Sequence, residues 1–556
     1  MNKIKVADYL VQELNKLGID DFFGLPGDYN FNILYAIGDN PNTNWVGCTN
    51  ELNAGYAADG YARIKGYGAL VTTYGVGELS AMNAIAGSFA ENIPVIKIAG
   101  VPATKFIKNN TLIHHNFQNP DYYACERAFS NVVETTAYLD ENNAKAEIDR
   151  ILSVFIEKKR PVYIAIPMDV CLLEIENTPN IKQAETDSKS LNQAVEHAMK
   201  LINKSKFPLI LGDVLVKRYQ ARQEFNELLV KTQFPVSNLL MGKGLIEATN
   251  PMYLGTFLSK YENINAHNAL QDSDCVISVG VINSDLNTYR TGLPFKPDDF
   301  IEIQGIFTII EHKKYENILM KDMLNALSKK IEARKIDLPE KKPSFAKTEA
   351  ADNTKLSSKY IYPRLQEFLK PDDMIFVETG IIPHGFAPTR LPKNTEFNSQ
   401  TLWGSIGWAT AAAFGGQMAA KERRTILLTG EGSHQLTATE VSNMMHNKLK
   451  PIVIVFNNAG YTIERVLSND PYDFFNEVIK WDYSKLPQVF DGEICVLQAK
   501  TNLEFDNALK QAKIEQKSKM CYIEIFTEKM DLPELTQKII GHLQNSNSNQ
   551  KNTVKT

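Results

Sequence analysis

The chain has 556 residues, and 44% of them are apolar, so it is long enough to form about three domains of ordinary size. The 65 acidic residues nearly balance the 60 Lys and Arg residues, which leaves a formal net charge of −5. A charge this small, spread over so large a surface, is not expected to draw the protein to nucleic acid or to anionic lipid.

The N-terminal segment predicts an amphipathic helix instead of a signal peptide. Val6, Leu10 and Leu14 recur at helical spacing among charged residues, and Gly18 is placed to end the helix. No uninterrupted apolar run reaches the roughly 20 residues that span a bilayer. The six cysteines are widely spaced, with no C-x-x-C pair, which favours reduced thiols over disulfides or zinc. We therefore expect a soluble, cytoplasmic protein with no membrane partner.

Two polar, charged stretches, residues 177–190 and 340–358, are typical of linkers. They divide the chain into predicted domains at residues 1–185, 186–345 and 356–542, followed by a flexible tail at residues 543–556.

Each predicted domain alternates short β-branched runs with helical patterns. Examples of these runs are Val95–Ala99, Val162–Ile166, Leu209–Leu211, Cys275–Val279, Ile426–Thr429 and Ile452–Phe456. Such alternation is typical of parallel sheets covered by helices. We therefore predict an α/β protein with three domains, each built on a mostly parallel sheet.

Residues 424–467 predict a strand, a Gly-rich turn, a helix, a second strand and an Asn-rich turn in succession. If the two strands are parallel neighbours, Glu431 and Asn458 emerge at the same carboxyl edge of the sheet, where open α/β sheets bind ligands. The Glu431 carboxylate, the Asn458 amide oxygen and the Gly460 carbonyl would then supply part of the oxygen octahedron that Mg²⁺ prefers, with phosphate oxygens and water as the rest. Taken alone, each turn is more typical of an ordinary loop than of a metal site. Their separation by 27 residues across a strand–helix–strand unit favours the metal site.

Ordered sequence matches along the whole chain identify a known family. They are Gly24–Asp28, Asn50–Ala54 with Ala57–Arg63, Tyr74–Ser80, His114–His115, Leu402–Gly407, Gly430–Leu436 and Asn457–Glu464. With these motifs the sequence resembles the thiamine-diphosphate-dependent 2-oxo acid decarboxylases, which include pyruvate, phenylpyruvate, indolepyruvate and branched-chain 2-oxo acid decarboxylases. The resemblance implies a pyrimidine-binding first domain, a central domain and a diphosphate-binding third domain, with thiamine diphosphate and Mg²⁺ as cofactors. It also implies a homodimer or homotetramer, because the family's sites form between subunits.

The resemblance assigns cofactor contacts to specific positions. Glu51 would hydrogen-bond the pyrimidine ring, Gly404 would offer a backbone carbonyl to the aminopyrimidine, and Ile406 would hold the bent cofactor. The remaining cofactor contacts would come from Gly430, Gly432, Ser433 and Asn458, with Glu431, Asn458 and Gly460 on the metal. Without the resemblance, Glu51 would be interpreted as a helix-start glutamate favoured by the helix dipole.

Asp28, His114, His115 and Glu464 match the family's proton-handling residues. Without the resemblance, adjacent histidines in a polar loop would be a solvated surface pair, and they make a poor metal chelate because neighbouring side chains point apart. Decarboxylation of a 2-oxo acid with this cofactor needs a proton delivered before the aldehyde departs. Imidazoles and buried carboxylates titrate in the range that this transfer needs.

Three positions depart from the family's pattern. Glu431 stands where aspartate is usual, which adds a methylene at the metal. The residues from Asn116 to Gln118 follow the histidine pair in place of Thr-Leu-Gly, and Ile381 replaces a common polar residue, which makes the pocket wall more apolar. None of the three removes a catalytic position.

We predict the non-oxidative decarboxylation of a 2-oxo acid to an aldehyde and CO2. The resemblance implies a substrate pocket of Leu286, Pro383, Ile463 and Leu467. Neither Leu286 nor Pro383 is aromatic, so a longer aliphatic or aryl 2-oxo acid should be preferred to pyruvate, by about 0.8 kcal/mol for each buried methylene. If His384 or a backbone shift fills the space, an ordinary pyruvate decarboxylase results.

Two other functions stay open. One is a carboligase of the acetohydroxyacid synthase type, and the other is a non-catalytic cofactor-binding or assembly protein. A NAD-dependent dehydrogenase is disfavoured, because no G-x-G-x-x-G follows a predicted strand.

Overall fold

The computed structural model describes residues 3–289, 291–295, 300–334, 336–338 and 347–540. The chain divides into two compact units. Unit 1 comprises Met1–Glu185, Ala411–Glu422 and Thr439–Asn443, and unit 2 comprises Thr186–Thr410, Arg423–Ala438 and Met444–Thr556. The predicted tail at 543–556 lies outside the described residues, as does the first part of the second predicted linker.

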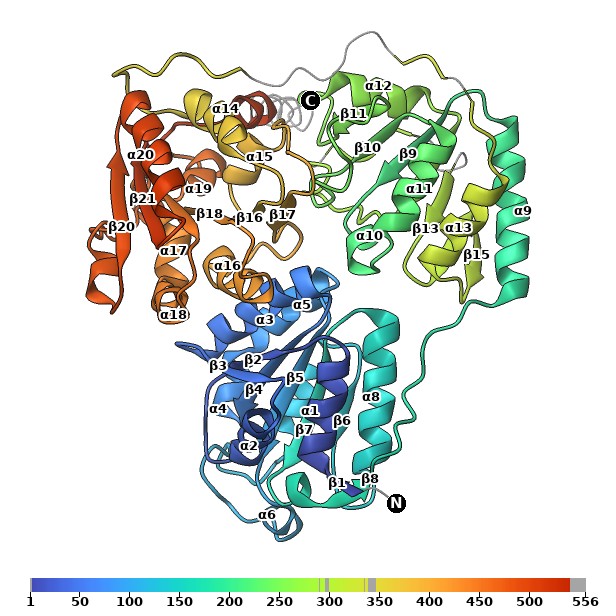
Figure 1. Cartoon of the computed structure of the whole chain (residues 1–556), viewed down its shortest axis with the longest axis vertical. Helices are drawn as coiled ribbons and strands as arrows, with labels where there is room; N and C mark the ends of the chain where they lie inside the picture. Colours follow the sequence, from blue (N-terminus) through green and yellow to red (C-terminus); the bar gives the residue numbers. More distant parts are fainter. Residues whose placement is uncertain (1–2, 290, 296–299, 335, 339–346, 541–556) are drawn as a thin grey trace, which may run out of the picture. The chain divides into compact units, whose positions relative to one another are not determined.

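Unit 1 is built around a six-stranded parallel sheet in the order β3-β2-β4-β5-β7-β6 (Figure 1). Its strands are β2 (Asp21–Gly24), β3 (Asn44–Gly47), β4 (Gly68–Thr73), β5 (Val95–Val101), β6 (Thr136–Tyr138) and β7 (Val162–Pro167), and β1 (Lys3–Lys5) pairs separately with β8 (Glu174–Glu176). Its helices include α1 (Val6–Lys16), α2 (Phe31–Asp39), α3 (Glu51–Lys65), α4 (Val76–Ser80), α5 (Met82–Ala90), α6 (Thr104–Lys108), α7 (Ala124–Phe129) and α8 (Ala144–Lys158). Strands β4, β5 and β7 are buried along their whole length, as expected when helices cover both faces of a parallel sheet.

Helix α1 confirms the prediction made for the N-terminal segment. Val6, Leu10 and Leu14 are buried on one side of it. The helix ends at Lys16, and Gly18 follows with a φ of 90°, a conformation that glycine adopts without strain.

The first sheet of unit 2 has seven strands in the order β11-β10-β9-β12-β13-β14-β15. The strands are β9 (Pro208–Gly212), β10 (Val236–Asn238), β11 (Tyr253–Thr256), β12 (Cys275–Val279), β13 (Phe300–Ile303), β14 (Phe307–Ile310) and β15 (Lys313–Glu316). The helices are α9 (Ser188–Lys204), α10 (Leu215–Arg218), α11 (Arg222–Thr232), α12 (Ile264–Asp272) and α13 (Met320–Lys330). The five neighbouring strands β11, β10, β9, β12 and β13 pair in parallel. Strand β14 pairs antiparallel with β13 and with β15, because the connections between these three strands are too short for a crossover helix.

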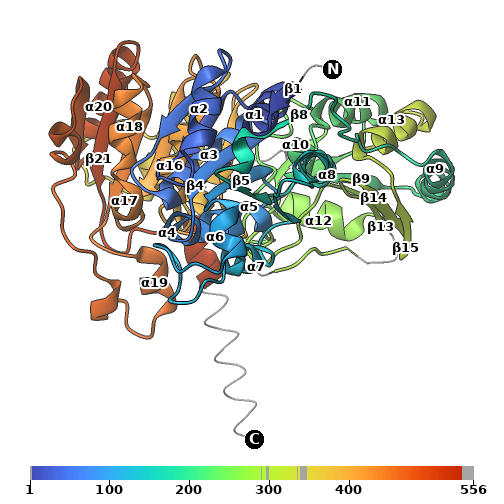
Figure 2. The same ribbon diagram turned by 90° about the horizontal axis from the view of Figure 1, so that it is seen from below.

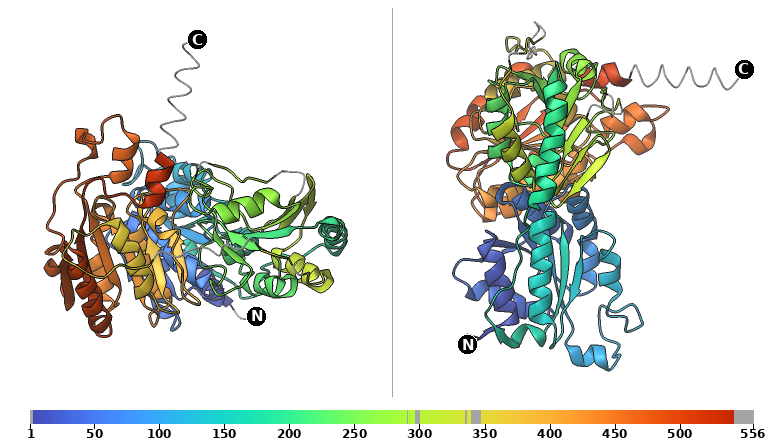
Figure 3. Two further views of the ribbon diagram at one scale, coloured as in Figure 1. Left: turned by 90° about the horizontal axis from the view of Figure 1, so that it is seen from above. Right: turned by 90° about the vertical axis from the view of Figure 1, so that its right-hand side faces the viewer.

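Alternate residues of this sheet face two different cores. Ile210 and Ile277 pack with side chains of α9, α11 and α13, whereas Leu209, Leu211 and Val276 pack with side chains of α12. Figure 2 shows α11 and α13 on one side of the sheet and α12 on the other, and the long helix α9 stands beside it in Figure 3.

The second sheet of unit 2 has six parallel strands in the order β17-β16-β18-β19-β21-β20. The strands are β16 (Met374–Val377), β17 (Glu396–Ser399), β18 (Thr425–Gly430), β19 (Ile452–Asn457), β20 (Ile494–Ala499) and β21 (Met520–Phe526). The helices of unit 2 that accompany them are α14 (Ser358–Phe368), α15 (Ile382–Phe386), α17 (Glu431–Thr437), α19 (Thr462–Leu467) and α20 (Asn502–Glu515). Most of α16 (Trp408–Ala419) and of α18 (Glu440–His446) belongs to unit 1. Leu240, Leu258 and Tyr289 pack in the same core as Ile375 and Ile426 of this sheet. The two halves of unit 2 therefore share a core.

These sheets confirm the predicted α/β class, and every predicted β-branched run falls within a strand. The boundaries of the predicted domains stay a prediction. The six cysteines are free, and all but Cys48 are buried. Within the described ranges, no helix combines the length and the apolar character that a membrane crossing requires.

Candidate active site

A cavity of about 550 Å³ lies within unit 2, at the carboxyl ends of the adjacent strands β17, β16, β18 and β19. Leu240, Leu286 and Tyr289, from the other half of unit 2, contribute to its wall. Every site residue predicted from unit 2 lines this cavity: Leu286, Pro383, Gly404, Ile406, Gly430, Glu431, Gly432, Ser433, Asn458, Gly460, Ile463, Glu464 and Leu467. The sheet thus gathers predicted residues from distant parts of the sequence at the edge where α/β sheets bind ligands.

Glu431 is the first residue of α17, directly after β18, and its side chain is buried. Its Oε1 accepts hydrogen bonds from the backbone N–H groups of Asn458 (3.2 Å) and Gly460 (2.8 Å). Burial raises the pKa of the Glu431 carboxyl to about 7. The three predicted metal ligands, which come from two loops, are therefore in direct contact.

The side-chain oxygen of Asn458 tests whether a cation fits here. This Oδ1 is enclosed and has no hydrogen-bond partner among the described residues. An enclosed oxygen without a partner is costly, and a hard cation would satisfy it. No group of three His, Cys, Asp or Glu side chains that could hold a metal occurs in the part of the chain that the structure describes. Glu431 and Asn458 thus fit a cation that completes its shell with ligand oxygens, such as those of a diphosphate.

Glycine is required at two positions beside this point. Gly460 has a φ of 157°, and a Cβ there would lie 2.2 Å from Nη2 of Arg465. A Cβ on Gly432 would lie 2.5 Å from the ring of Tyr461. A side chain at either position would displace the loop or the ring, so the approach of the two loops depends on glycine.

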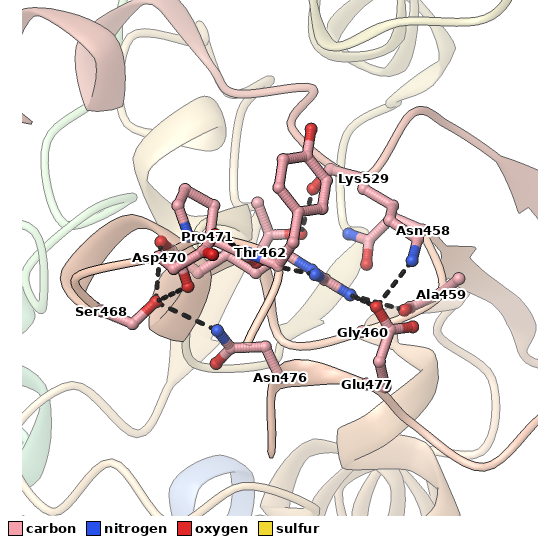
Figure 4. A network of polar contacts seen from close by, with 12 residues as sticks. Asn458, Ala459, Gly460, Thr462, Ser468, Asp470, Pro471, Asn476, Glu477 and Lys529 are labelled. Atoms are coloured by element: carbon pink, nitrogen blue, oxygen red, sulfur yellow. Dashed lines mark hydrogen bonds and ion pairs between the residues drawn. The ribbon is translucent and has the colours of Figure 1, made fainter. Parts of the chain in front are cut away.

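A buried arginine holds the loop that carries Asn458. Arg465 donates from Nη2 to the carbonyl of Ala459 (2.9 Å) and from Nη1 to that of Pro471 (2.8 Å). Its Nη2 also lies 3.1 Å from a carboxylate oxygen of Glu477. Figure 4 shows this polar network, with Ala459 and Pro471 labelled. No pattern in the sequence singles out Arg465, because a lone arginine in a helical stretch is usually exposed.

The loop that carries Gly404 and Ile406 is anchored by Glu378, which is buried at the end of β16. Oε2 of Glu378 accepts hydrogen bonds from the backbone N–H groups of Gly407 (3.2 Å) and Ala409 (3.1 Å). Burial raises the pKa of the Glu378 carboxyl to about 7. Gly404 has a φ of 66°, in the left-handed region that favours glycine.

The predicted substrate residues differ in exposure. Pro383 is buried and Leu286 and Ile463 are half-buried, whereas Leu467 is 54% exposed and so lies at the mouth of the cavity. Tyr289 also lines the wall, and no pattern in the sequence singles it out as a site residue.

In unit 1, two of the predicted proton-handling residues are paired. Nε2 of His114 lies 2.9 Å from Oδ2 of Asp28, and its Nδ1 lies 3.2 Å from the hydroxyl of Tyr29. The side chains of His114 and Asp28 are 58% and 50% exposed. His115 instead donates from Nδ1 to the backbone carbonyl of Tyr74 at 3.1 Å. The adjacent histidines thus turn to different partners, as expected for neighbouring positions.

Asn116, which departs from the family's pattern, stabilises the histidine loop. Its Nδ2 donates to the hydroxyl of Tyr74 (3.0 Å), and its Oδ1 accepts from the backbone N–H of Ile113 (3.2 Å). These two bonds close the loop around the histidine pair, so the altered sequence still gives an ordered loop.

Glu51 begins α3, directly after the capping residue. The side chain of Asn50 accepts a hydrogen bond from the backbone N–H of Asn53 (2.8 Å) and so starts the helix. The Glu51 carboxylate packs against Gly77, where a Cβ would lie 3.1 Å from its Oε1. Because Asn50 provides the cap, the Glu51 side chain is available for another role.

Three family models match the chain in succession. They are the N-terminal TPP binding domain of thiamine pyrophosphate enzymes at residues 4–125, the central domain of these enzymes at 195–328, and their C-terminal TPP binding domain at 382–525. Asp28, Glu51, His114 and His115 lie within the first match.

Curated relatives align over nearly the whole chain. A pyruvate decarboxylase of Kluyveromyces lactis is 36% identical over 547 residues, which are 96% of this chain and 97% of the relative. Pyruvate decarboxylase isozyme 1 of Saccharomyces cerevisiae is 35% identical over 550 residues, again 96% and 97%. A pyruvate decarboxylase of Hanseniaspora uvarum is 33% identical over 549 residues, with the same coverage of 96% and 97%.

Proposed function

The chain belongs to the thiamine-diphosphate-dependent 2-oxo acid decarboxylases. From that premise we propose that it decarboxylates a 2-oxo acid to an aldehyde and CO2, with residues from the cavity of unit 2 and from the histidine loop of unit 1. One observation carries the proposal. In the cavity, the Glu431 carboxylate contacts the loop of Asn458, whose amide oxygen is enclosed and unpartnered among the described residues. This arrangement supports a cation bound together with a diphosphate.

We assign the cofactor to this cavity. Glu431, the Asn458 amide and the Gly460 carbonyl would hold Mg²⁺. The other cofactor contacts would come from Gly404, Ile406, Gly430, Gly432 and Ser433, all of which line the cavity. When bound, thiamine diphosphate supplies the electron sink that lets CO2 leave a 2-oxo acid. Arg465 would act as a positioning residue, because it holds the carbonyl of Ala459 next to two of the metal ligands.

Proton handling would fall to Glu464 at the cavity and to Asp28, His114 and His115 in unit 1. The Asp28 carboxylate lies 2.9 Å from Nε2 of His114, so a proton can pass between the two groups through this hydrogen bond. The bond from Nδ1 of His115 to a carbonyl leaves its Nε2 as the acceptor nitrogen. Glu51 would hold a proton at the pyrimidine ring.

For the substrate, we propose a longer aliphatic or aryl 2-oxo acid, such as 2-oxoisocaproate, phenylpyruvate or indolepyruvate, with pyruvate accepted at a lower specificity constant. Leu286, Pro383 and Ile381 all line the cavity and none is aromatic. Each further methylene buried against them would contribute about 0.8 kcal/mol. The relatives are named pyruvate decarboxylases, so a preference for pyruvate is the alternative that the assay below decides.

We also propose a homodimer or homotetramer with sites between subunits. The support is the exposure of the Asp28–His114 pair, because a proton-transfer group works best where water is excluded and so calls for a covering surface. Size-exclusion chromatography with light scattering measures the assembly. Location in the cytoplasm stays a prediction that cell fractionation would check.

The deciding experiment supplies purified protein with thiamine diphosphate and Mg²⁺ and offers it a panel of 2-oxo acids. We expect aldehyde and CO2 in equal amounts, and none when either cofactor is withheld. A carboligase would give a coupled hydroxy-oxo product instead of the aldehyde, and a non-catalytic protein would bind the cofactor without releasing CO2.

Glu464→Gln tests the assignment of the acid at the cavity. Loss of a positioned acid or base commonly costs about 10² to 10⁴ in rate, so turnover should fall by that amount while cofactor binding persists. Glu493→Gln, at an exposed position outside the cavity, is the matched control and should keep full turnover.

A further inference from the structure

The cavity wall carries a histidine–tyrosine pair that the proposed reaction does not use. The hydroxyl of Tyr289 lies 3.0 Å from Nδ1 of His384, and the two rings meet edge to face with 4.3 Å between their centroids. The two residues are 8% and 7% exposed, and both line the cavity. Tyr289 follows β12, whereas His384 lies in α15, so the pair joins the two halves of unit 2 at this wall.

The bond to Tyr289 uses one ring nitrogen of His384 and leaves Nε2 available. Nε2 has no hydrogen-bond partner among the described residues. It also differs from the unpaired polar atoms that are fully enclosed by protein, because it keeps some exposed surface. His434 provides a contrast: its Nδ1 also pairs with a hydroxyl, that of Thr410 at 2.9 Å, but its Nε2 is fully enclosed and it does not line the cavity. Nε2 of His384 therefore remains accessible from the cavity.

The chemistry of this nitrogen restricts its partner. Burial lowers the pKa of His384 to about 3, so the imidazole is neutral. The wall of the cavity also includes the apolar Leu240, Leu286 and Pro383. Nε2 is a donor when Tyr289 donates to Nδ1 and an acceptor in the other tautomer. A hydroxyl group can pair with it in both cases, whereas a charged group would lose its hydration there without gaining an opposite charge.

We propose that the His384–Tyr289 pair is a specificity element that favours 2-oxo acids whose side chain ends in a hydroxyl group, above all a phenolic one. This inference rests on the proposed function, because it requires the substrate's side chain to enter the part of the cavity formed by Leu286 and Pro383. The proposed preference depends on hydrogen bonding by the wall and adds to the preference that the size of the pocket sets. Apolar walls discriminate weakly between substrates that differ by one hydroxyl, whereas a hydrogen-bonding group on the wall discriminates strongly.

Two substrates that differ by one hydroxyl, 4-hydroxyphenylpyruvate and phenylpyruvate, test the proposal on the holoenzyme. In the unaltered protein, we expect the specificity constant for 4-hydroxyphenylpyruvate to be about tenfold higher than that for phenylpyruvate. His384→Phe should bring that ratio below one, because the phenol would then be buried without a partner. Tyr289→Phe removes only the hydroxyl that orients the imidazole, and should lower the ratio about threefold. His434→Phe is the matched control and should leave the ratio at the unaltered value.

The same ratio in the unaltered protein and in His384→Phe would overturn the proposal, as would a preference for phenylpyruvate in the unaltered protein. If His384→Phe does not fold, Tyr289→Phe decides the question, and an unchanged ratio there overturns the proposal. Failure of the proposed function is distinguishable, since the holoenzyme would then release CO2 from no 2-oxo acid. In that event, calorimetry measures the affinities of the two acids for the holoenzyme, and the ratio of these affinities replaces the ratio of specificity constants.

Discussion

The cavity of unit 2 and the histidine loop of unit 1 carry residues for one proposed reaction in opposite environments. In the cavity, Glu431 is 2% exposed and burial raises its pKa to about 7. In the loop, the side chains of Asp28 and His114 are half exposed. Charge interactions are strong where solvent is excluded and are screened where it is not. The cavity is therefore already organised for binding, whereas the loop needs a covering surface before its groups act with comparable strength.

The strongest test of this difference combines two inactive variants in one oligomer. Glu51→Gln alters unit 1 and Glu431→Ala alters unit 2, and each alone should lose about 10² to 10⁴ in turnover. If sites form between subunits, a mixed oligomer contains some sites in which both regions are unaltered. Co-expression of the two chains should therefore restore aldehyde formation, measured on oligomers purified through a different tag on each chain.

Purified mixed oligomers that stay inactive would show that the two regions do not meet across a subunit boundary. Asn50→Ala is the control for Glu51→Gln, because it removes the helix cap and leaves the carboxylate in place. It should cost about 1 kcal/mol of stability while turnover is retained.

The pH dependence of stability tests the buried side of the comparison. Asp213 supports the loop of Leu286, because its Oδ2 accepts from Nδ2 of Asn287 (2.7 Å) and from the backbone N–H of Ile282 (3.1 Å). Burial raises its pKa from the ordinary 3.8 to about 7. Between these values the folded protein holds a proton that the unfolded chain has lost, so this group's contribution to the free energy of unfolding falls as pH rises and is constant above about 7.

Asp213→Asn should make that pH slope shallower. One pKa unit corresponds to about 1.4 kcal/mol, so the effect across the window is on the order of 2 to 4 kcal/mol. Urea unfolding of the metal-free protein at several pH values measures it, and the constant difference between the two proteins above neutral pH is the internal control. Parallel slopes in the two proteins would contradict the prediction.

Replacement of Glu431 tests the binding side. Glu431→Gln removes a charge from the predicted metal shell, so the affinities for Mg²⁺ and thiamine diphosphate should fall together, by about 10- to 100-fold. Glu431→Asp keeps the charge and should bind with little loss. Titration calorimetry of one cofactor in the presence of the other measures both affinities, and an unchanged affinity in Glu431→Ala would remove this residue from the site.

The smallest expected effect concerns the size of the cavity. Leu286→Phe fills part of the wall, so the specificity constant for 2-oxoisocaproate relative to pyruvate should fall about tenfold. Leu467→Phe lies at the exposed mouth and should change this ratio less. If pyruvate is the better substrate of the unaltered protein and Leu286→Phe leaves the ratio as it is, the argument from an open pocket is wrong.

Local patterns predicted the elements of this fold, and ordered motifs predicted which residues of unit 2 share a cavity. The helix of Val6, Leu10 and Leu14 and the buried strands around Ile426 and Ile452 lie where periodicity and β-branched runs indicated. These predictions succeeded because period and turn chemistry are properties of neighbouring residues. The predicted metal ligands could be grouped for a related reason, since parallel neighbouring strands bring their following loops to one edge.

The contacts that no pattern indicated join residues that no helical or strand period relates, whether six residues apart, as for Arg465, or 95 apart, as for Tyr289 and His384. Arg465 reaches the carbonyls of Ala459 and Pro471, and Tyr289 meets His384 across the two halves of unit 2. A lone arginine, tyrosine or histidine has the same local signature on a surface as in a cavity wall, and only packing determines its partner.

The α/β class, the family and the set of residues at the strand ends could be predicted from the amino-acid sequence, because they follow from local periodicity and from motifs in a fixed order. Which polar atoms lack a partner, and which nitrogen remains accessible from the cavity, depends on packing in three dimensions. Burial and the resulting pKa of a group such as Glu431, Asp213 or His384 depend on everything packed around it. That surrounding shell is assembled from several strands and loops at once, and no stretch of the chain encodes it alone.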